Sequence, residues 1–143
     1  MTEASEVPAG ERHILVEKAN GIASITFNRP EKKNAFTHAM YSAVIDALND
    51  AGKDDDVRAV LITGAGSAFT AGNDLKDMAA NLVRVADCPP GRFLQALTAL
   101  RAGLVGGVDG PALGIGWTAL LHCELGYATQ RSLFGFPFVD LGL

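Results

Sequence analysis

The sequence predicts an α/β fold in which short strands and helices alternate along the chain. Two observations support this expectation. Short β-like apolar runs are separated by helix-like amphipathic runs, and two glycine-punctuated loops, residues 68–75 and 110–118, each follow a β-like run and open into a helix-like run. At 143 residues the chain is long enough for one domain with a sizeable core.

The first elements are predicted to be a hairpin and a helix. Residues 13–18 and 22–27 read as strands around Asn20-Gly21, a dipeptide suited to a type I′ turn. In residues 37–49 apolar side chains recur at helical spacing, and Thr37 stands where an N-cap would stand.

The middle of the chain repeats the strand, loop and helix order. Residues 57–63 read as a buried strand that leads into the first loop, and Asp74 is placed to cap a helix running toward Asn81. Residues 89–91, Pro-Pro-Gly, separate that helix from a second amphipathic helix near 93–101.

The last third begins with a predicted strand at residues 104–108, which leads into the second loop. A helix at 116–122 and short strands at 125–128 and 133–134 are expected to follow it.

The composition is apolar for a small protein. Apolar residues make up 48% of this 15.0 kDa chain and the mean hydropathy is +0.18, so we expect a partner surface or a missing portion of chain. Apolar residues also crowd the last ten positions, so we interpret the end as abrupt, as in a truncated chain.

Charge argues against nucleic acid as a partner. The net charge is −4 and no basic stripe is present. Residues 1–12 are polar and acidic without signal-peptide features, so we expect a flexible N-terminal segment and a cytoplasmic protein. Cys88 and Cys123 lack metal-ligand spacing, so we predict reduced thiols and no metal site.

A membrane span is an alternative for residues 102–121, whose only charged residue is Asp109 and which contain GxxxG spacings. A central Asp109, together with Pro111 and the many glycines, argues against a continuous spanning helix. We therefore expect no membrane span.

The two loops have the composition for binding a developing anion. Small residues let a ligand carbonyl approach the backbone, and N–H groups at a helix start attract negative charge. Residues 114–116 lack the third glycine of a dinucleotide motif, and residues 64–66 lack the Gly-Lys of a phosphate-binding loop. Stabilisation of an oxyanion is the chemistry that remains.

Four segments in order resemble signatures of the crotonase superfamily, the enoyl-CoA hydratase/isomerase enzymes. They are residues 26–30 (TFNRP), 33–35 (KNA), 69–75 (FTAGNDL) and 108–114 (VDGPALG). The resemblance implies the N-terminal part of a crotonase-like ββα spiral core in residues 13–143, with the C-terminal helical region of a typical member absent. It also implies a homotrimer or hexamer for the full-length protein.

The resemblance further implies an oxyanion hole made by the backbone N–H groups of Asn73 and Ile115, which would bind the thioester carbonyl of an acyl-CoA substrate without any cofactor. Arg29, Lys32 and Lys76 are expected as phosphate contacts. The residues implied to contact or flank the substrate and its coenzyme A part are Lys33, Asn34, Ala35, Ala71, Gly72, Asn73, Asp74, Leu75, Gly114, Ile115, Thr118 and Phe138.

The general base is where the sequence departs from hydratases. Family hydratases carry glutamates at the positions of Thr118 and Phe138, and neither of these side chains can act as a base. The motifs instead resemble the Δ3,Δ2-enoyl-CoA isomerase branch, whose single glutamate lies a few residues beyond the segment matching 141–143. Asp140 is the best candidate base in this chain.

Other polar residues have structural interpretations. We expect Asp74 to cap a helix, Asp109 to bond backbone N–H groups of the second loop, and His122 to lie packed or at a helix end. His38 has no recognisable partner, and Trp117 could line an acyl pocket or pack in the core.

Enoyl-CoA isomerisation is therefore the expected function. A hydratase-like enzyme and a truncated acyl-CoA-binding or interaction protein without catalysis stay open as alternatives.

Overall fold

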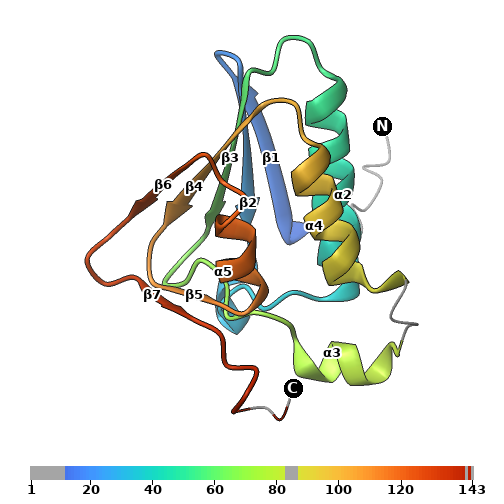
Figure 1. Cartoon of the computed structure of the whole chain (residues 1–143), viewed down its shortest axis with the longest axis vertical. Helices are drawn as coiled ribbons and strands as arrows, with labels where there is room; N and C mark the ends of the chain where they lie inside the picture. Colours follow the sequence, from blue (N-terminus) through green and yellow to red (C-terminus); the bar gives the residue numbers. More distant parts are fainter. Residues whose placement is uncertain (1–11, 83–86, 141, 143) are drawn as a thin grey trace, which may run out of the picture.

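The computed structural model describes residues 12–82, 87–140 and 142 and confirms the α/β fold. One sheet has five strands in the order β1-β2-β3-β4-β6, and a second sheet pairs β5 with β7 (Figure 1). The strands are β1 Ile14–Ala19, β2 Ile22–Phe27, β3 Ala59–Gly64, β4 Gly103–Val108, β5 Pro111–Leu113, β6 Leu125–Ala128 and β7 Leu133–Gly135. The β1–β2 pair is antiparallel and the other pairs are parallel.

The predicted hairpin is confirmed. Strands β1 and β2 are joined by Asn20 and Gly21, whose φ angles are 54° and 79°. Positive φ at both central residues is what a type I′ turn requires, because that turn matches the twist of the two strands.

Helix α2 crosses from β2 to β3. After the short 3-10 turn η1 (Pro30–Lys32), α2 covers His38–Lys53, and the Thr37 hydroxyl accepts a hydrogen bond from the Met40 N–H at 3.2 Å, so the predicted N-cap is confirmed. The helix runs four residues beyond the expected end at 49, because Ala51 adds another buried apolar contact on the same face.

Helix α3 (Leu75–Ala80) follows the first loop as predicted. The Asp74 carboxylate accepts from the Asp77 N–H at 2.9 Å, which makes it the N-cap.

Helix α4 (Pro89–Ala99) corrects the prediction that residues 89–91 lie outside the helix. Pro89 and Pro90 occupy the first helical positions. Backbone N–H groups have no intrahelical acceptor there, so proline, which lacks an N–H, is tolerated.

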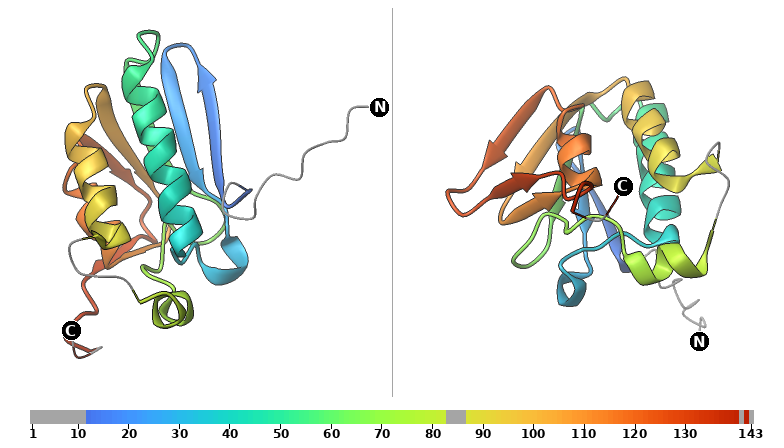
Figure 2. Two further views of the ribbon diagram at one scale, coloured as in Figure 1. Left: turned by 90° about the vertical axis from the view of Figure 1, so that its right-hand side faces the viewer. Right: turned by 60° about the horizontal axis from the view of Figure 1, so that its bottom comes forward.

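The helices α2 and α4 run side by side along one face of the large sheet (Figure 2). Alternate residues of the central strands face them and are fully buried, among them Ile25, Phe27, Val60 and Ile62. The aromatic rings of Phe36, Tyr41 and Phe93 fill the end of this core next to the first loop.

Residues 102–121 form β4, β5 and helix α5 (Ile115–Leu120). Among the residues that the structure describes, no helix combines the length and apolar character needed to cross a membrane.

Strand β5 was missed by sequence reasoning, which read residues 110–118 as one loop. The strand has only three residues, begins with proline and exists because it pairs with β7, so its own sequence carries little signal.

Candidate active site

The two glycine-punctuated loops lie in direct contact. Thr70 pairs with Ala112 in an isolated parallel bridge: the Thr70 N–H donates to the Pro111 carbonyl at 3.1 Å, and the Leu113 N–H donates to the Thr70 carbonyl at 3.0 Å. A Cβ built on Gly116 would lie 2.4 Å from the Thr70 side chain. Glycine at 116 is therefore required for α5 to approach the first loop this closely.

A small pocket opens where these loops meet. Its lining comes from both loops and from the segment after β7, and consists of Ala71, Gly72, Asn73, Leu75, Gly114, Ile115, Pro137 and Phe138. The structure thus brings Asn73 and Ile115, which are 42 residues apart in the chain, to one pocket.

Both predicted oxyanion-hole amides are unpaired in the part of the chain that the structure describes. The Phe36 N–H donates to the Gly72 carbonyl and the Asp74 N–H donates to the Phe36 carbonyl, each at 2.8 Å, which leaves the intervening Asn73 N–H out of the bridge. Within residues 12–82, 87–140 and 142, neither the Asn73 N–H nor the Ile115 N–H donates a hydrogen bond to the protein. Two such donors at one pocket can bind a carbonyl oxygen that becomes negative during a reaction.

Gly114 fixes the start of α5 beside the pocket. Its backbone has φ 56° and ψ −119°, a conformation that residues other than glycine rarely adopt. Its N–H donates to the Gly135 carbonyl at 2.9 Å, which ties the second loop to β7 next to the Ile115 amide.

Asp74 and Arg29 hold the first loop. An Arg29 guanidinium nitrogen lies 2.8 Å from the Asp74 carboxylate and 3.0 Å from the Ala35 carbonyl. The Asp77 N–H and then the Arg29 guanidinium lower the pKa of Asp74, so this carboxylate stays ionised as a cap. Asp74 thus holds the first loop in addition to capping α3. One guanidinium nitrogen of Arg29, a residue expected to contact a phosphate, is bonded within the protein.

Asn34, expected beside the substrate, lies beneath the first loop. It is fully buried with φ 57°. Its side chain accepts from the Arg29 N–H at 2.8 Å and donates to the Ala65 and Ala68 carbonyls at 2.9 and 2.8 Å. Every polar group of the side chain is used to shape the turn and none reaches the surface, so the structure shows a role for Asn34 in holding the loop, and its place beside the substrate stays a prediction.

The neighbours of Asn34 are more accessible. Lys33 is exposed in a left-handed conformation, and its carbonyl accepts from the Ala71 N–H at 2.9 Å. Ala35 is half-buried, and both Lys32 and Lys76 are exposed. A role of these residues in binding coenzyme A stays a prediction.

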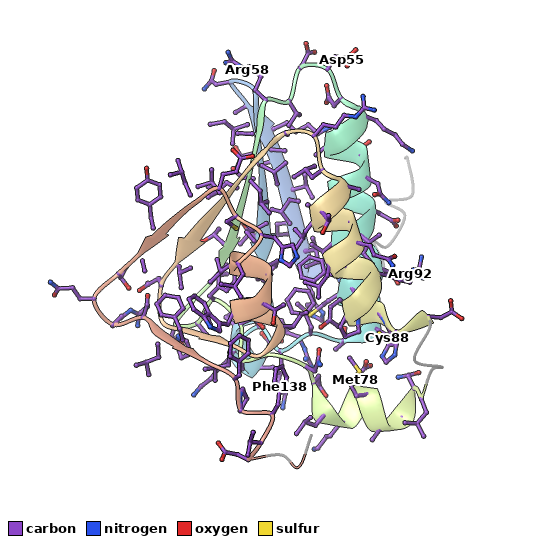
Figure 3. The ribbon with its side chains drawn as sticks, in the orientation of Figure 1. Asp55, Arg58, Met78, Cys88, Arg92 and Phe138 are labelled. Carbon is purple, nitrogen blue, oxygen red and sulfur yellow. The ribbon has the colours of Figure 1, made fainter. Side chains whose placement is uncertain are left out.

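Thr118 and Phe138, at the positions matching the hydratase glutamates, both form contacts within the protein. The Thr118 hydroxyl donates to the Gly114 carbonyl at 3.2 Å within α5. Figure 3 shows Phe138 below α5, on the side toward α3, and its ring carbons come within 3.6 and 3.7 Å of a Cβ built on Gly114. Phe138 therefore covers one side of the pocket with an apolar ring.

Asp140 lies outside this pocket. It is exposed, and the pocket lining in the described part of the chain includes no carboxylate. A role of Asp140 as the general base stays a prediction.

Asp109 stabilises the second half of the chain through partners that were not expected. Its carboxylate accepts from the Thr129 hydroxyl at 2.7 Å and from two Arg131 nitrogens at 2.6 Å each, and no backbone N–H of the described residues reaches it. Arg131 and then Thr129 lower the pKa of Asp109 to about 2.

His38 and His122 form hydrogen bonds within the protein, and the two cysteines are not bonded to each other. His38, for which no partner was recognised, lies 2.6 Å from the Asp77 carboxylate and joins α2 to α3. The His122 ring bonds the Thr118 carbonyl at 3.0 Å at the end of α5, as expected of a helix-end histidine. Cys88 and Cys123 are both free thiols.

Trp117 is not among the residues that line this pocket and packs against two phenylalanines. Its ring lies 4.7 Å from that of Phe134 and 6.3 Å from that of Phe136, measured between centroids.

Comparison with known proteins shows the family of this chain. A sequence model described as enoyl-CoA hydratase/isomerase matches residues 17–143. The chain belongs to the enoyl-CoA hydratase/isomerase family. It is therefore a crotonase-superfamily chain, and its named relatives favour the isomerase branch within that superfamily.

Individual relatives in the family show how much of a member is present. Enoyl-CoA delta isomerase 2 of Rattus norvegicus is 39% identical over 135 residues, which are 90% of this chain and 34% of the relative. OdaA of Pseudomonas aeruginosa aligns with a TM-score of 0.87 and 44% identity over 92% of this chain and 53% of that one. An enoyl-CoA hydratase/isomerase of Pseudoalteromonas atlantica aligns with a TM-score of 0.84 and 42% identity over 92% and 52%. The chain thus spans about a third to a half of the length of these family members.

Proposed function

We propose that this chain binds the thioester group of an enoyl-CoA and stabilises the enolate formed when its double bond is shifted. The proposal rests on one observation: within the part of the chain that the structure describes, the backbone N–H groups of Asn73 and Ile115 have no hydrogen-bond partner, and both residues line one pocket.

The chemistry follows from where charge develops. Removal of a proton next to a thioester carbonyl moves negative charge onto the carbonyl oxygen, and return of the proton at another carbon completes the isomerisation. Fixed donors aimed at that oxygen lower the barrier, and one such donor is typically worth about 10²- to 10³-fold in rate.

The backbone around the pocket is suited to hold these donors in place. The bridge between Thr70 and Ala112 fixes the distance between the two loops, and the glycines at 72 and 114 add no side chain to the pocket lining. Phe138, Leu75 and Pro137 make the remaining wall apolar, which suits an acyl group.

The wall at Phe138 favours isomerisation over hydration. Hydration of an enoyl-CoA requires a water molecule held and activated at the double bond, and Phe138 supplies neither a hydrogen bond nor a base. In this proposal Asp140, or a carboxylate supplied from outside the described residues, transfers the proton.

A second candidate is acyl-CoA binding without turnover. It is favoured by one observation, which is that the pocket lining in the described residues contains no carboxylate. The two candidates share the oxyanion hole and differ only in proton transfer.

Two measurements separate them. Titration with a saturated acyl-CoA tests binding, and the absorbance of the conjugated product tests conversion of a 3-enoyl-CoA to the 2-enoyl form. Binding with turnover supports the isomerase, and loss of turnover in Asp140→Asn with binding retained identifies the base. Binding without turnover supports the second candidate, and the absence of binding contradicts both.

A further inference from the structure

Tyr41 contacts the predicted oxyanion-hole loop from inside the core. This residue lies in the first turns of α2 and is fully buried, and its hydroxyl donates a hydrogen bond to the Asn73 side-chain oxygen. Asn73 lines the pocket. The hydroxyl and the pocket are thus linked through one side chain.

The position of the Tyr41 hydroxyl is restricted by the packing of its ring. The ring centroid lies 4.8 Å from that of Phe36 and 5.9 Å from that of Phe93, and all three rings are buried. Close packing on both sides restricts rotation of the ring. Burial also raises the pKa of Tyr41 far above its ordinary value, so the phenol is a neutral donor throughout the working pH range.

The backbone on either side of Asn73 is held by Phe36, and Tyr41 is the partner of the Asn73 side chain. The flanking groups at Gly72 and Asp74 bond Phe36, and the Asn73 N–H itself has no protein partner in the described residues. Gly72, with φ 99°, precedes it and has wide conformational freedom. The bond from Tyr41 therefore adds a further hold on residue 73, through its side chain and from the core side, to the two Phe36 bonds that hold the flanking peptides.

We propose that Tyr41 is a positioning residue for the oxyanion hole: its hydroxyl holds Asn73 so that the Asn73 N–H stays directed into the pocket. The inference rests on the proposed function, because it assigns Tyr41 a role in binding the thioester oxygen. Preorganised donors act because they need no reorientation as charge develops, so a looser Asn73 weakens recognition of the carbonyl and leaves binding of the rest of the ligand intact.

The experiment compares two ligands of equal acyl length. One is a saturated acyl-CoA, and the other is the corresponding alkyl thioether of coenzyme A, which lacks the carbonyl oxygen. The ratio of their dissociation constants reports the oxyanion hole alone. Tyr41→Phe removes one hydroxyl, and Tyr127→Phe makes the same change at an exposed tyrosine on β6.

We expect the wild-type chain to prefer the thioester, and Tyr41→Phe to reduce that preference by about 3- to 10-fold, the range of one hydrogen bond. Tyr127→Phe keeps the wild-type ratio. Adding Tyr41→Phe to Asn73→Ala produces no further loss, because the hydroxyl acts through the Asn73 side chain. Circular dichroism confirms that each variant is folded before its ratio is measured.

The possible failures are distinguishable. A wild-type chain without preference for the thioester overturns the proposed function, and the inference with it. A wild-type preference that Tyr41→Phe retains overturns the inference alone, as does an equal loss in both ligands, which would mark Tyr41 as a purely structural residue.

Discussion

At the scale of single residues, Asn34 shows how one side chain shapes the site without touching a ligand. Its amide bonds Arg29, Ala65 and Ala68, so the turn after β2 and the segment after β3 are held together at one buried point. The Thr70 hydroxyl donates to the Asn34 carbonyl at 2.7 Å and accepts from the Gly72 N–H at 3.1 Å. The position of the first loop therefore depends on Asn34.

Replacing Asn34 with alanine is expected to destabilise the protein strongly. The change removes the partner of one buried and two partly buried backbone groups, which costs about 2–4 kcal/mol in unfolding free energy. Asn49→Ala, on the exposed side of α2, is the matched control and should change stability by less than about 0.5 kcal/mol. Urea denaturation of both variants measures this, and equal midpoints would contradict the role given to Asn34.

The Asp109 carboxylate gives a pH dependence of known sign. Its pKa in the folded chain is lowered from 3.8 to about 2 by Arg131 and Thr129. A depressed folded pKa stabilises the fold above the ordinary value, so this contribution is complete above about pH 4 and is lost as the pH falls toward 2. NMR titration of the Asp109 carboxyl carbon should give a midpoint near 2.

Arg131→Gln is the control for that titration. It removes the guanidinium that contributes most to the lowered pKa, so the midpoint should rise toward the ordinary aspartate value. An unchanged midpoint would show that Arg131 does not pair with Asp109 in solution.

At the scale of secondary structure, the start of α5 carries the strictest geometric demand. Gly114 adopts φ 56° and ψ −119°, and its N–H and carbonyl are bonded to β7 and to Thr118. The orientation of the Ile115 N–H follows directly from this turn. A glycine at 114 is thus required by backbone conformation rather than by lack of space, since the atom nearest to an added methyl group would be 3.6 Å away.

Gly114→Ala should therefore weaken both folding and thioester binding. The strained backbone costs about 1–3 kcal/mol, or else the turn relaxes and moves the Ile115 N–H. Gly126→Ala in β6 is the control, because no atom lies within 4 Å of the added methyl group. Thermal unfolding and acyl-CoA titration of both variants provide the test, and wild-type behaviour of Gly114→Ala would argue against this geometry.

Elements with a local signal were predictable from the sequence, and elements defined by distant partners were not. The Asn20-Gly21 turn, the Thr37 cap and the Asp74 cap are encoded within a few residues and are confirmed. Strand β5 was missed, because it depends on pairing with β7. The predicted start of α4 was wrong, because Pro89 and Pro90 were interpreted as a separator and not as the first residues of the helix.

The same distinction holds for the candidate site. The family signatures indicated the loops of Asn73 and Ile115, and the structure places both residues at one pocket. The supporting hydrogen bonds of Tyr41 and Thr70 were not predicted. Tyr41 lies 32 residues from its partner Asn73 in the sequence, and Thr70 lies 36 residues from its partner Asn34. Sequence periodicity cannot show which buried polar groups meet.

At the scale of the whole molecule, the high apolar content of the chain leaves large apolar side chains exposed to solvent. Large apolar side chains that are more than half exposed gather on β6, on β7 and after them, namely Leu125, Tyr127, Leu133 and Val139. Large exposed apolar side chains in such number mark sites of association. We expect the chain to self-associate through this region.

Sedimentation velocity over a range of concentrations tests that expectation. The apparent mass should rise with concentration, and Leu125→Lys combined with Leu133→Lys should shift the protein toward the monomer. Leu82→Lys, an exposed leucine after α3, should leave the distribution unchanged. A compact monomer at every concentration would contradict self-association.

The most direct test of the central claim is to observe the two amides themselves. In an assigned NMR spectrum, addition of a saturated acyl-CoA should shift the Asn73 and Ile115 amide protons downfield, because each gains a hydrogen bond to the thioester oxygen. The matching thioether should leave both resonances near their free positions. Equal responses to the two ligands, or no response at either amide under saturating thioester, would contradict the proposed oxyanion hole.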